Sequence, residues 1–187
     1  PILEGPTDDL TSLAGTALYI ANGDIIQASL RYAVGWKVGI HLDANASNSE
    51  NHNVRFEVMD RCETGLKLSA SGGRYLDMCE IAGNTIGICK YGVYFETATS
   101  GVVADTSISV QQIWQEISGG AGIYGSGSSI QRNRVYVQYL RSESTANTPG
   151  GGSFKGPWVA GDQTVNGEAG FLSGTLNTFT IGENPPG

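Results

Sequence analysis

The sequence is poor in charged residues and has no long apolar run. Only 16% of its 187 residues are Asp, Glu, Lys or Arg, and they leave a net charge of −7. Nucleic-acid binding needs clustered Lys and Arg, so this balance argues against nucleic acid as a partner. No stretch of about 18 apolar residues occurs, so membrane insertion is not expected. The chain begins at Pro1 without a signal peptide, which suggests a fragment of a longer protein.

Cysteine and histidine are also scarce. The three cysteines are an odd number, which argues against a disulfide framework. The two histidines, His41 and His52, have no partner His or Cys at metal-ligand spacing, so neither a metal nor another cofactor is expected. Glycine, in contrast, is abundant at 27 residues. Together with short segments rich in Asn and Ser, it indicates a turn-rich, all-β protein.

Four short segments of similar sequence recur at nearly even spacing. Each is a glycine followed by an apolar, a polar or aromatic, and an apolar residue, except that the last segment ends in Gly125. The first residues of the segments are Gly39, Gly65, Gly92 and Gly122, which lie 26, 27 and 30 residues apart. A repeat of this length is typical of stacked coils, each of which buries its apolar face only against its neighbours.

The alternation within these segments predicts which side chains point inward. Residues two apart share one face of a strand. The expected inward ladders are Ile40, Leu66, Val93 and Ile123, and then Leu42, Leu68 and Phe95. The expected outward residues are His41, Lys67, Tyr94 and Tyr124. Alternation at residues 54–58 indicates at least one more strand per coil. Counting back from the glycines matches Ile25 with Ile108 and Leu30 with Ile113.

The chain divides into three parts. Residues 1–24 are expected to form an N-terminal cap or first rung, residues 25–141 the coils, and residues 142–187 a loop and an irregular C-terminal β segment. The first part allows two structures. One is a rung at residues 15–18, and the other is a helix capped at residues 7–9 with Leu10 and Leu13 on one face. Either would protect the open end of a stack.

The glycine-anchored rungs resemble the right-handed, single-stranded parallel β-helix, and specifically the trimeric tailspike and tail-fibre proteins of bacteriophages. Pectin-degrading enzymes, autotransporter passengers and adhesins share this coil. The resemblance implies a homotrimer in the virion tail, assembled in the host cytoplasm, that binds bacterial surface polysaccharide and often cleaves it. Three functions therefore compete: a polysaccharide-binding shaft, a polysaccharide depolymerase of the hydrolase or lyase type, and a bacterial adhesin repeat.

Two carboxylates are candidates for catalysis. Asp43 and Glu96 each stand four residues after a repeat glycine and lie two coils apart, with Ser69 at the same offset between them. Glycosidases use two carboxyl groups that face one groove. Regular stacking predicts a separation on the order of 9–10 Å for this pair. The alternative is two solvated carboxylates at the ends of strands.

Outward aromatic residues are candidates for ligand binding. Tyr94 and Tyr124 should form one stripe, with Lys67 in the same row and Trp114 nearby. Tyrosine and tryptophan offer an apolar plane and a hydrogen-bonding edge to sugars, but they are also enriched at subunit interfaces, which is the favoured interpretation of this stripe from the sequence. Finally, Cys62 and Cys89 each precede a repeat glycine by three residues, which predicts stacked, buried thiols, whereas Cys79 is not aligned with them.

Overall fold

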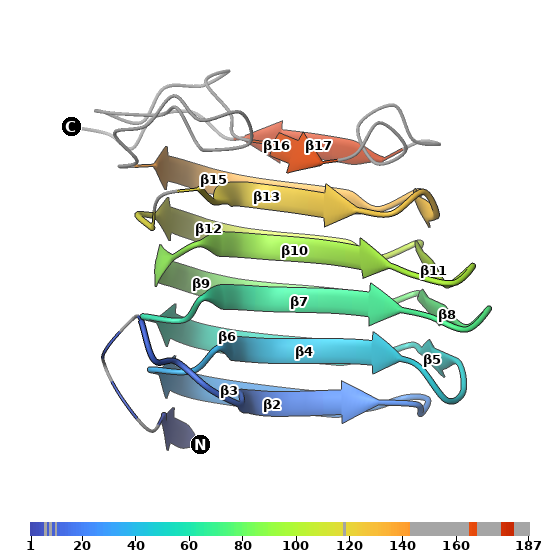
Figure 1. Ribbon diagram of the computed structural model, residues 1–187, viewed down its shortest axis with the longest axis horizontal. Helices are drawn as coiled ribbons and strands as arrows, with labels where there is room; N and C mark the ends of the chain where they lie inside the picture. Colours follow the sequence, from blue (N-terminus) through green and yellow to red (C-terminus); the bar gives the residue numbers. More distant parts are fainter. Residues whose placement is uncertain are drawn as a thin grey trace.

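The computed structural model describes residues 1–142 except 6, 8, 10 and 118, together with 165–167 and 177–181. All the regular structure in these residues is β, and the strands stack as a parallel solenoid of about five turns (Figure 1). The all-β parallel β-helix expected from the sequence is therefore confirmed. Because the described residues contain no helix, none of them forms a helix that could cross a membrane.

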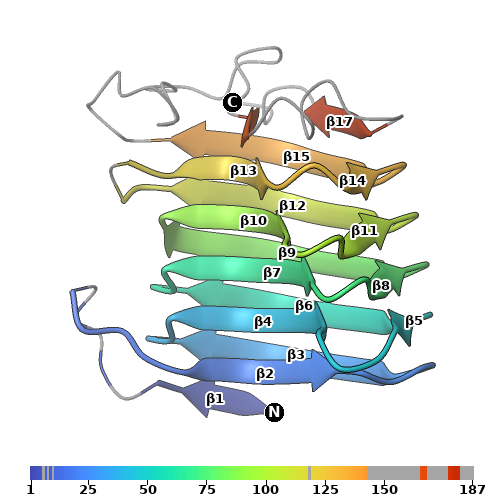
Figure 2. The same ribbon diagram turned by 45° about the vertical axis from the view of Figure 1, so that its right-hand side comes forward.

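Each complete coil contributes one strand to each of three parallel sheets. The seven-stranded sheet consists of β1 (Ile2–Glu4), β3 (Gln27–Val34), β6 (Asn53–Asp60), β9 (Glu80–Cys89), β12 (Ser107–Gln115), β15 (Arg134–Ser142) and β17 (Thr178–Ile181). The six-stranded sheet consists of β2 (Thr16–Ala21), β4 (Val38–Ala44), β7 (Thr64–Ala70), β10 (Tyr91–Thr97), β13 (Ala121–Ser126) and β16 (Val165–Gly167). The four-stranded sheet, visible in Figure 2, consists of β5 (Ser49–Glu50), β8 (Tyr75–Asp77), β11 (Val102–Ala104) and β14 (Ile130–Gln131).

The register of the six-stranded sheet agrees with the sequence-based ladders. Ile40, Leu66, Val93 and Ile123 lie opposite one another on β4, β7, β10 and β13, and all four are fully buried. The second ladder of Leu42, Leu68 and Phe95 is buried as well, and it ends at Gly125. The residues between the ladders are partly exposed on the outer surface. The interior of the coil is therefore a continuous apolar core.

The matches made upstream of the glycines are wrong. Ile25 lies outside the strands, is 74% exposed and has φ of 56°, whereas Ile108 is buried. Leu30 lies in the row of Val110, and not in that of Ile113. The reason is that the turn before Gly122 is longer than the turn before Gly92. Ile86 stands six residues before its repeat glycine, whereas Ile113 stands nine before Gly122.

At the N-terminus the structure has the rung and not the helix. β2 pairs with β4, and Leu18 lies opposite Ile40, so the rung is displaced by two residues from the expected alignment on Gly15. At the other end, β16 and β17 pair with β13 and β15 and continue two of the sheets. Most of the expected C-terminal loop and irregular segment, 142–187, lies outside the described residues.

Candidate functional site

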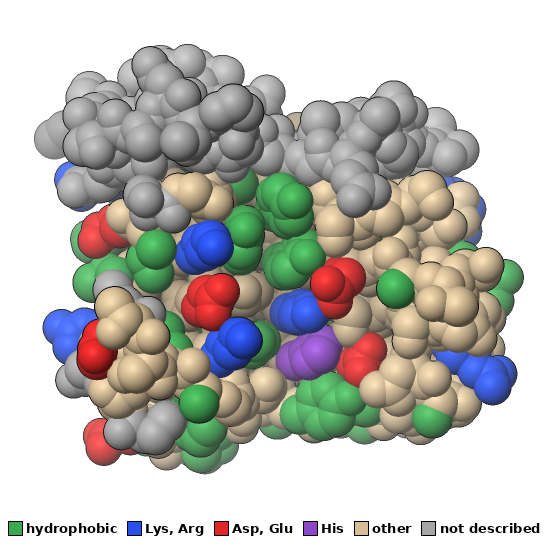
Figure 3. Space-filling model, in the orientation of Figure 1, with side chains coloured by type: hydrophobic (Ala, Val, Ile, Leu, Met, Phe, Trp, Pro, Cys, Tyr) green, Lys and Arg blue, Asp and Glu red, His purple; other side chains and the backbone are tan. Residues whose placement is uncertain are grey.

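The outer surface of the six-stranded sheet carries two rows of aromatic, charged and hydroxyl side chains. The strand register sets these rows, because each outward residue lies opposite its counterpart on the next strand. Figure 3 shows acidic, basic and histidine side chains gathered over the middle of this sheet. We call this surface the polar face; it comprises one row of Tyr19, His41, Lys67, Tyr94 and Tyr124, a second row of Asp43, Ser69, Glu96 and Ser126, and Tyr91 beside them.

Three tyrosines form a cluster at one end of the polar face. The ring centroids of Tyr91, Tyr94 and Tyr124 lie 5.0–5.2 Å from one another. The ammonium groups of Lys67 and Lys90 lie over the rings of Tyr94 and Tyr91, at 5.4 and 5.3 Å from the centroids. These contacts hold the rings in place while leaving each of them partly exposed.

An ion pair lies beside the tyrosine cluster. Lys67 Nζ is 2.7 Å from Glu96 Oε2, and the Tyr94 hydroxyl donates to Glu96 Oε1 at 3.2 Å. Ser126 Oγ also lies 3.1 Å from the Tyr94 hydroxyl. Burial is the main cause that raises the pKa of Tyr94 to about 12, so this hydroxyl keeps its proton at neutral pH. The group is a fixed set of hydrogen-bond donors and acceptors.

Asp43 lies at the other end of the polar face in a closed hydrogen-bond network. Its carboxylate accepts from the Tyr19 hydroxyl at 2.7 Å, from Ser69 Oγ at 2.5 Å and from Asn45 Nδ2 at 2.5 Å. Only 8% of Asp43 is exposed. Both carboxylate oxygens of Asp43 therefore already accept hydrogen bonds from other side chains of the protein.

His41 completes this network but does not activate Ser69. His41 Nε2 lies 2.7 Å from Ser69 Oγ. Because the single hydroxyl proton of Ser69 goes to Asp43, the imidazole must donate the hydrogen bond from Nε2. Burial lowers the pKa of His41, so the neutral ring is favoured. The arrangement is a structural network and does not prepare a serine nucleophile.

The structure brings together five of the six candidate residues from the sequence. Asp43 and Glu96 share one row with Ser69 between them, as expected, and Lys67, Tyr94 and Tyr124 share the neighbouring row. Trp114 lies elsewhere, on β12 of the seven-stranded sheet. There its Nε1 donates to Gln112, and the Arg141 guanidinium stacks 5.7 Å from its ring.

Sequence reasoning missed Tyr19 and Tyr91. Strict alternation from Val93 would turn Tyr91 inward, but the alternation breaks at Gly92, and the ring of Tyr91 lies on the outer side, 5.2 Å from that of Tyr94. Tyr19 was missed because the first rung was aligned two residues off. No group of three or more His, Cys, Asp or Glu among the described residues is arranged to hold a metal ion.

Comparison with known proteins gives no match. No protein-family model matches the sequence, and neither a curated protein nor a solved structure matches it significantly. Functional inference for this chain therefore rests on the coil and on the side chains that it displays.

Proposed function

We propose that this chain is the polysaccharide-binding part of a phage tail spike or tail fibre and that it binds bacterial surface polysaccharide through the polar face. The observation that carries the proposal is the tyrosine cluster beside the Lys67–Glu96 ion pair. The C–H faces of sugar rings pack on partly exposed tyrosines, while sugar hydroxyls form strong hydrogen bonds with charged partners. Binding to a face that is already ordered also loses little side-chain entropy.

The composition of the polar face favours a sugar over a subunit interface. Charged residues are depleted at the centres of protein–protein interfaces. The middle of the polar face holds Lys67 and Glu96, and their side chains are 21% and 38% exposed. Burial of this pair against another subunit would remove both charges from water. We expect the assembly contacts of a trimer on the other faces of the coil.

The hydrogen bonding favours binding over cleavage. A glycosidase needs one carboxyl group that can protonate a leaving group and a second that acts on the sugar or on water. Asp43 is nearly inaccessible and already accepts three hydrogen bonds, and Glu96 is ion-paired with Lys67. A depolymerase that uses this pair is therefore the second candidate, which rests on the shared row of Asp43 and Glu96.

A panel of purified bacterial capsular polysaccharides and lipopolysaccharides tests both candidates. The immobilised protein should retain at least one of them, and the bound material should show no new reducing ends and no unsaturated uronates. New chain ends would favour the depolymerase. If no polysaccharide is retained, or if all are retained equally by the protein and by its Tyr124→Ala variant, the proposal for the polar face is wrong.

A further inference from the structure

A second surface, on the seven-stranded sheet, has the form of a furrow. Three adjoining hollows lie along it, the largest of about 920 Å³ at the corner with the four-stranded sheet. Glu80 and Ser107 line both the first and the second hollow, and Arg55, Ala82 and Ser109 line both the second and the third. Because neighbouring hollows share these residues, the furrow runs without interruption along the strands β9 and β12.

The strand register explains the shape of the furrow. The outward row on β6, β9, β12 and β15 reads Arg55, Ala82, Ser109 and Tyr136. In this row the short side chains of Ala82 and Ser109 form the floor of the furrow. The long side chains of Arg55 and Tyr136, on the strands to either side, form its walls. β6 and β15 are three strand spacings apart, roughly 14 Å. Tyr136, which is 42% exposed, offers its ring at the β15 wall.

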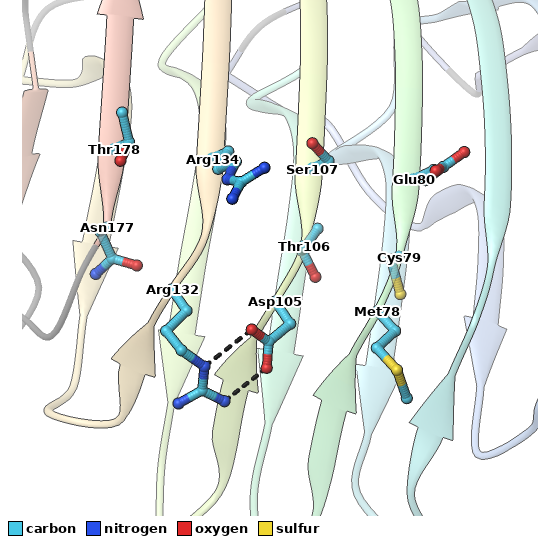
Figure 4. A pocket seen from close by; sticks show the side chains of 10 residues that line it. All are labelled: Met78, Cys79, Glu80, Asp105, Thr106, Ser107, Arg132, Arg134, Asn177 and Thr178. Atoms are coloured by element: carbon cyan, nitrogen blue, oxygen red, sulfur yellow. Dashed lines mark hydrogen bonds and ion pairs between the residues drawn. The ribbon is translucent and has the colours of Figure 1, made fainter.

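The arginines of this region fall into two classes. Arg132 forms a bidentate pair with Asp105 at 2.9 and 2.6 Å, and Arg31 pairs with Glu57 at 3.3 Å. Arg55 and Arg134 are exposed, and within the described part of the chain neither side chain has an ion pair or a hydrogen bond. Figure 4 shows Arg134 reaching over the hollow between Thr178 and Ser107, apart from the Arg132–Asp105 pair.

We propose that this furrow is a second saccharide site, which binds a linear acidic polysaccharide through its carboxylates. This inference deepens the proposed function and rests on it for the choice of polysaccharide as the ligand. A guanidinium group binds a carboxylate with two parallel hydrogen bonds, and Arg55 and Arg134 are the two that have this capacity free. Tyr136 offers its ring to a sugar, and Glu80 with the two floor serines offers hydrogen bonds to hydroxyl groups.

The net charge makes the two arginines necessary for this binding. The chain carries −7, so its overall field repels a polyanion and gives no general attraction. Only local cations can hold an acidic chain, and the paired arginines are already neutralised by Asp105 and Glu57. Binding is thus expected to depend on Arg55 and Arg134 and to weaken as salt is added.

Calorimetric titration with an acidic oligosaccharide and its neutral form tests the furrow. The probes are an oligogalacturonate, its fully methyl-esterified form and a hyaluronan oligosaccharide. At least one of the acidic probes should bind, and the ester should not. The Arg55→Gln and Arg134→Gln variants should each weaken binding by on the order of tenfold. Arg74→Gln is the control, because Arg74 is exposed like the two arginines but lines none of the three hollows, and this variant should bind as the unmodified protein does.

The outcomes separate this site from the polar face. Loss of acidic-probe binding in the arginine variants, with Tyr94→Ala unchanged, supports the furrow whatever happens at the polar face. Equal binding of the acid and its ester, unchanged binding in both arginine variants, or no binding of either acidic probe overturns it. Thermal unfolding of each variant shows that the fold is intact. Polysaccharide retention that depends on Tyr124 but not on the arginines would support the proposed function alone.

Discussion

A Cβ atom at Gly65 would lie 2.3 Å from Cγ2 of Ile86. Gly92 has the same relation to Ile113, at 2.5 Å, and Gly122 has it to Leu140 Cδ1, at 2.3 Å. Each repeat glycine of the six-stranded sheet therefore leaves space for an inward side chain of the seven-stranded sheet. The recurrence of glycine is a packing requirement across the lumen and not a turn signal.

Replacement of Gly65 by alanine should destabilise the coil. The added methyl group cannot be accommodated without moving Ile86 or the backbone, and overpacking of this kind costs about 1–3 kcal/mol. The midpoint of urea denaturation should fall accordingly. Gly23→Ala is the control, because a Cβ there meets its nearest atom at an ordinary 3.8 Å.

Shortening Ile86 should partly rescue the Gly65→Ala variant. The Ile86→Ala change alone leaves a cavity, but combined with Gly65→Ala it removes Cγ2, the atom that the new methyl group would otherwise meet at 2.3 Å. The double variant should therefore be more stable than the sum of the two single effects implies, as a double-mutant cycle would show. Strict additivity would mean that the two residues do not compete for the same space.

The three thiols should be unreactive in the folded protein. Cys62, Cys79 and Cys89 are free and buried, as expected for Cys62 and Cys89. Burial raises the pKa of the Cys62 and Cys79 thiols to about 11, and it raises the pKa of Cys89 well above its usual value. A thiol reagent at neutral pH should label none of them until denaturant is added. Fast labelling of Cys62 and Cys89 in the native state would contradict the strand register.

The buried His52 should make the protein less stable in mild acid. Its Nδ1 accepts from the Ile26 backbone N–H at 3.3 Å, and its Nε2 lies 2.8 Å from Ser49 Oγ. Protonation would break the first bond and bury a charge, and burial lowers the pKa of His52 below its ordinary value of 6.5. The contribution of neutral His52 to stability is thus present above about pH 6.5, and it is lost as the pH falls towards the pKa of His52 in the folded protein.

Comparison with a His52→Gln variant isolates this effect. The free energy of unfolding of the unmodified protein should fall more steeply between pH 7 and pH 5 than that of the variant. Burial raises the pKa of Asp77, which acts in the opposite direction, but this contribution is the same in both proteins. Parallel pH profiles would show that His52 does not titrate on unfolding.

A homotrimer remains the expected assembly. The solenoid exposes large apolar side chains outside the polar face and the furrow, among them Ile2 at 58% and Ile25 at 74%. Closed symmetric association would cover such groups without forming filaments. Light scattering at micromolar concentration should give three times the chain mass; a monomer would contradict the prediction for this chain.

The sequence predicts the rungs well because their signal is local. Alternation around Gly65 and Gly92 sets both the inward ladder and the outward row, and it places Lys67 beside Tyr94. The four-stranded sheet escapes this reasoning, because strands as short as β5 (Ser49–Glu50) show no alternation. The furrow could not be predicted from the sequence either. Its row of Arg55 and Tyr136 depends on the strand register of the seven-stranded sheet, and the longer turn before Gly122 hides that register.

The most direct test of the central claim compares two tyrosines in a calorimetric titration with a fragment of the polysaccharide that the protein retains. Tyr94 lies within the polar face, whereas Tyr75 is an exposed tyrosine on β8 of the four-stranded sheet. Tyr94→Ala should weaken binding by on the order of tenfold, because a sugar–aromatic contact and the hydroxyl beside Glu96 are lost together. Tyr75→Ala should leave the affinity unchanged. An unchanged affinity in Tyr94→Ala, or an equal loss in both variants, would contradict polysaccharide binding at the polar face.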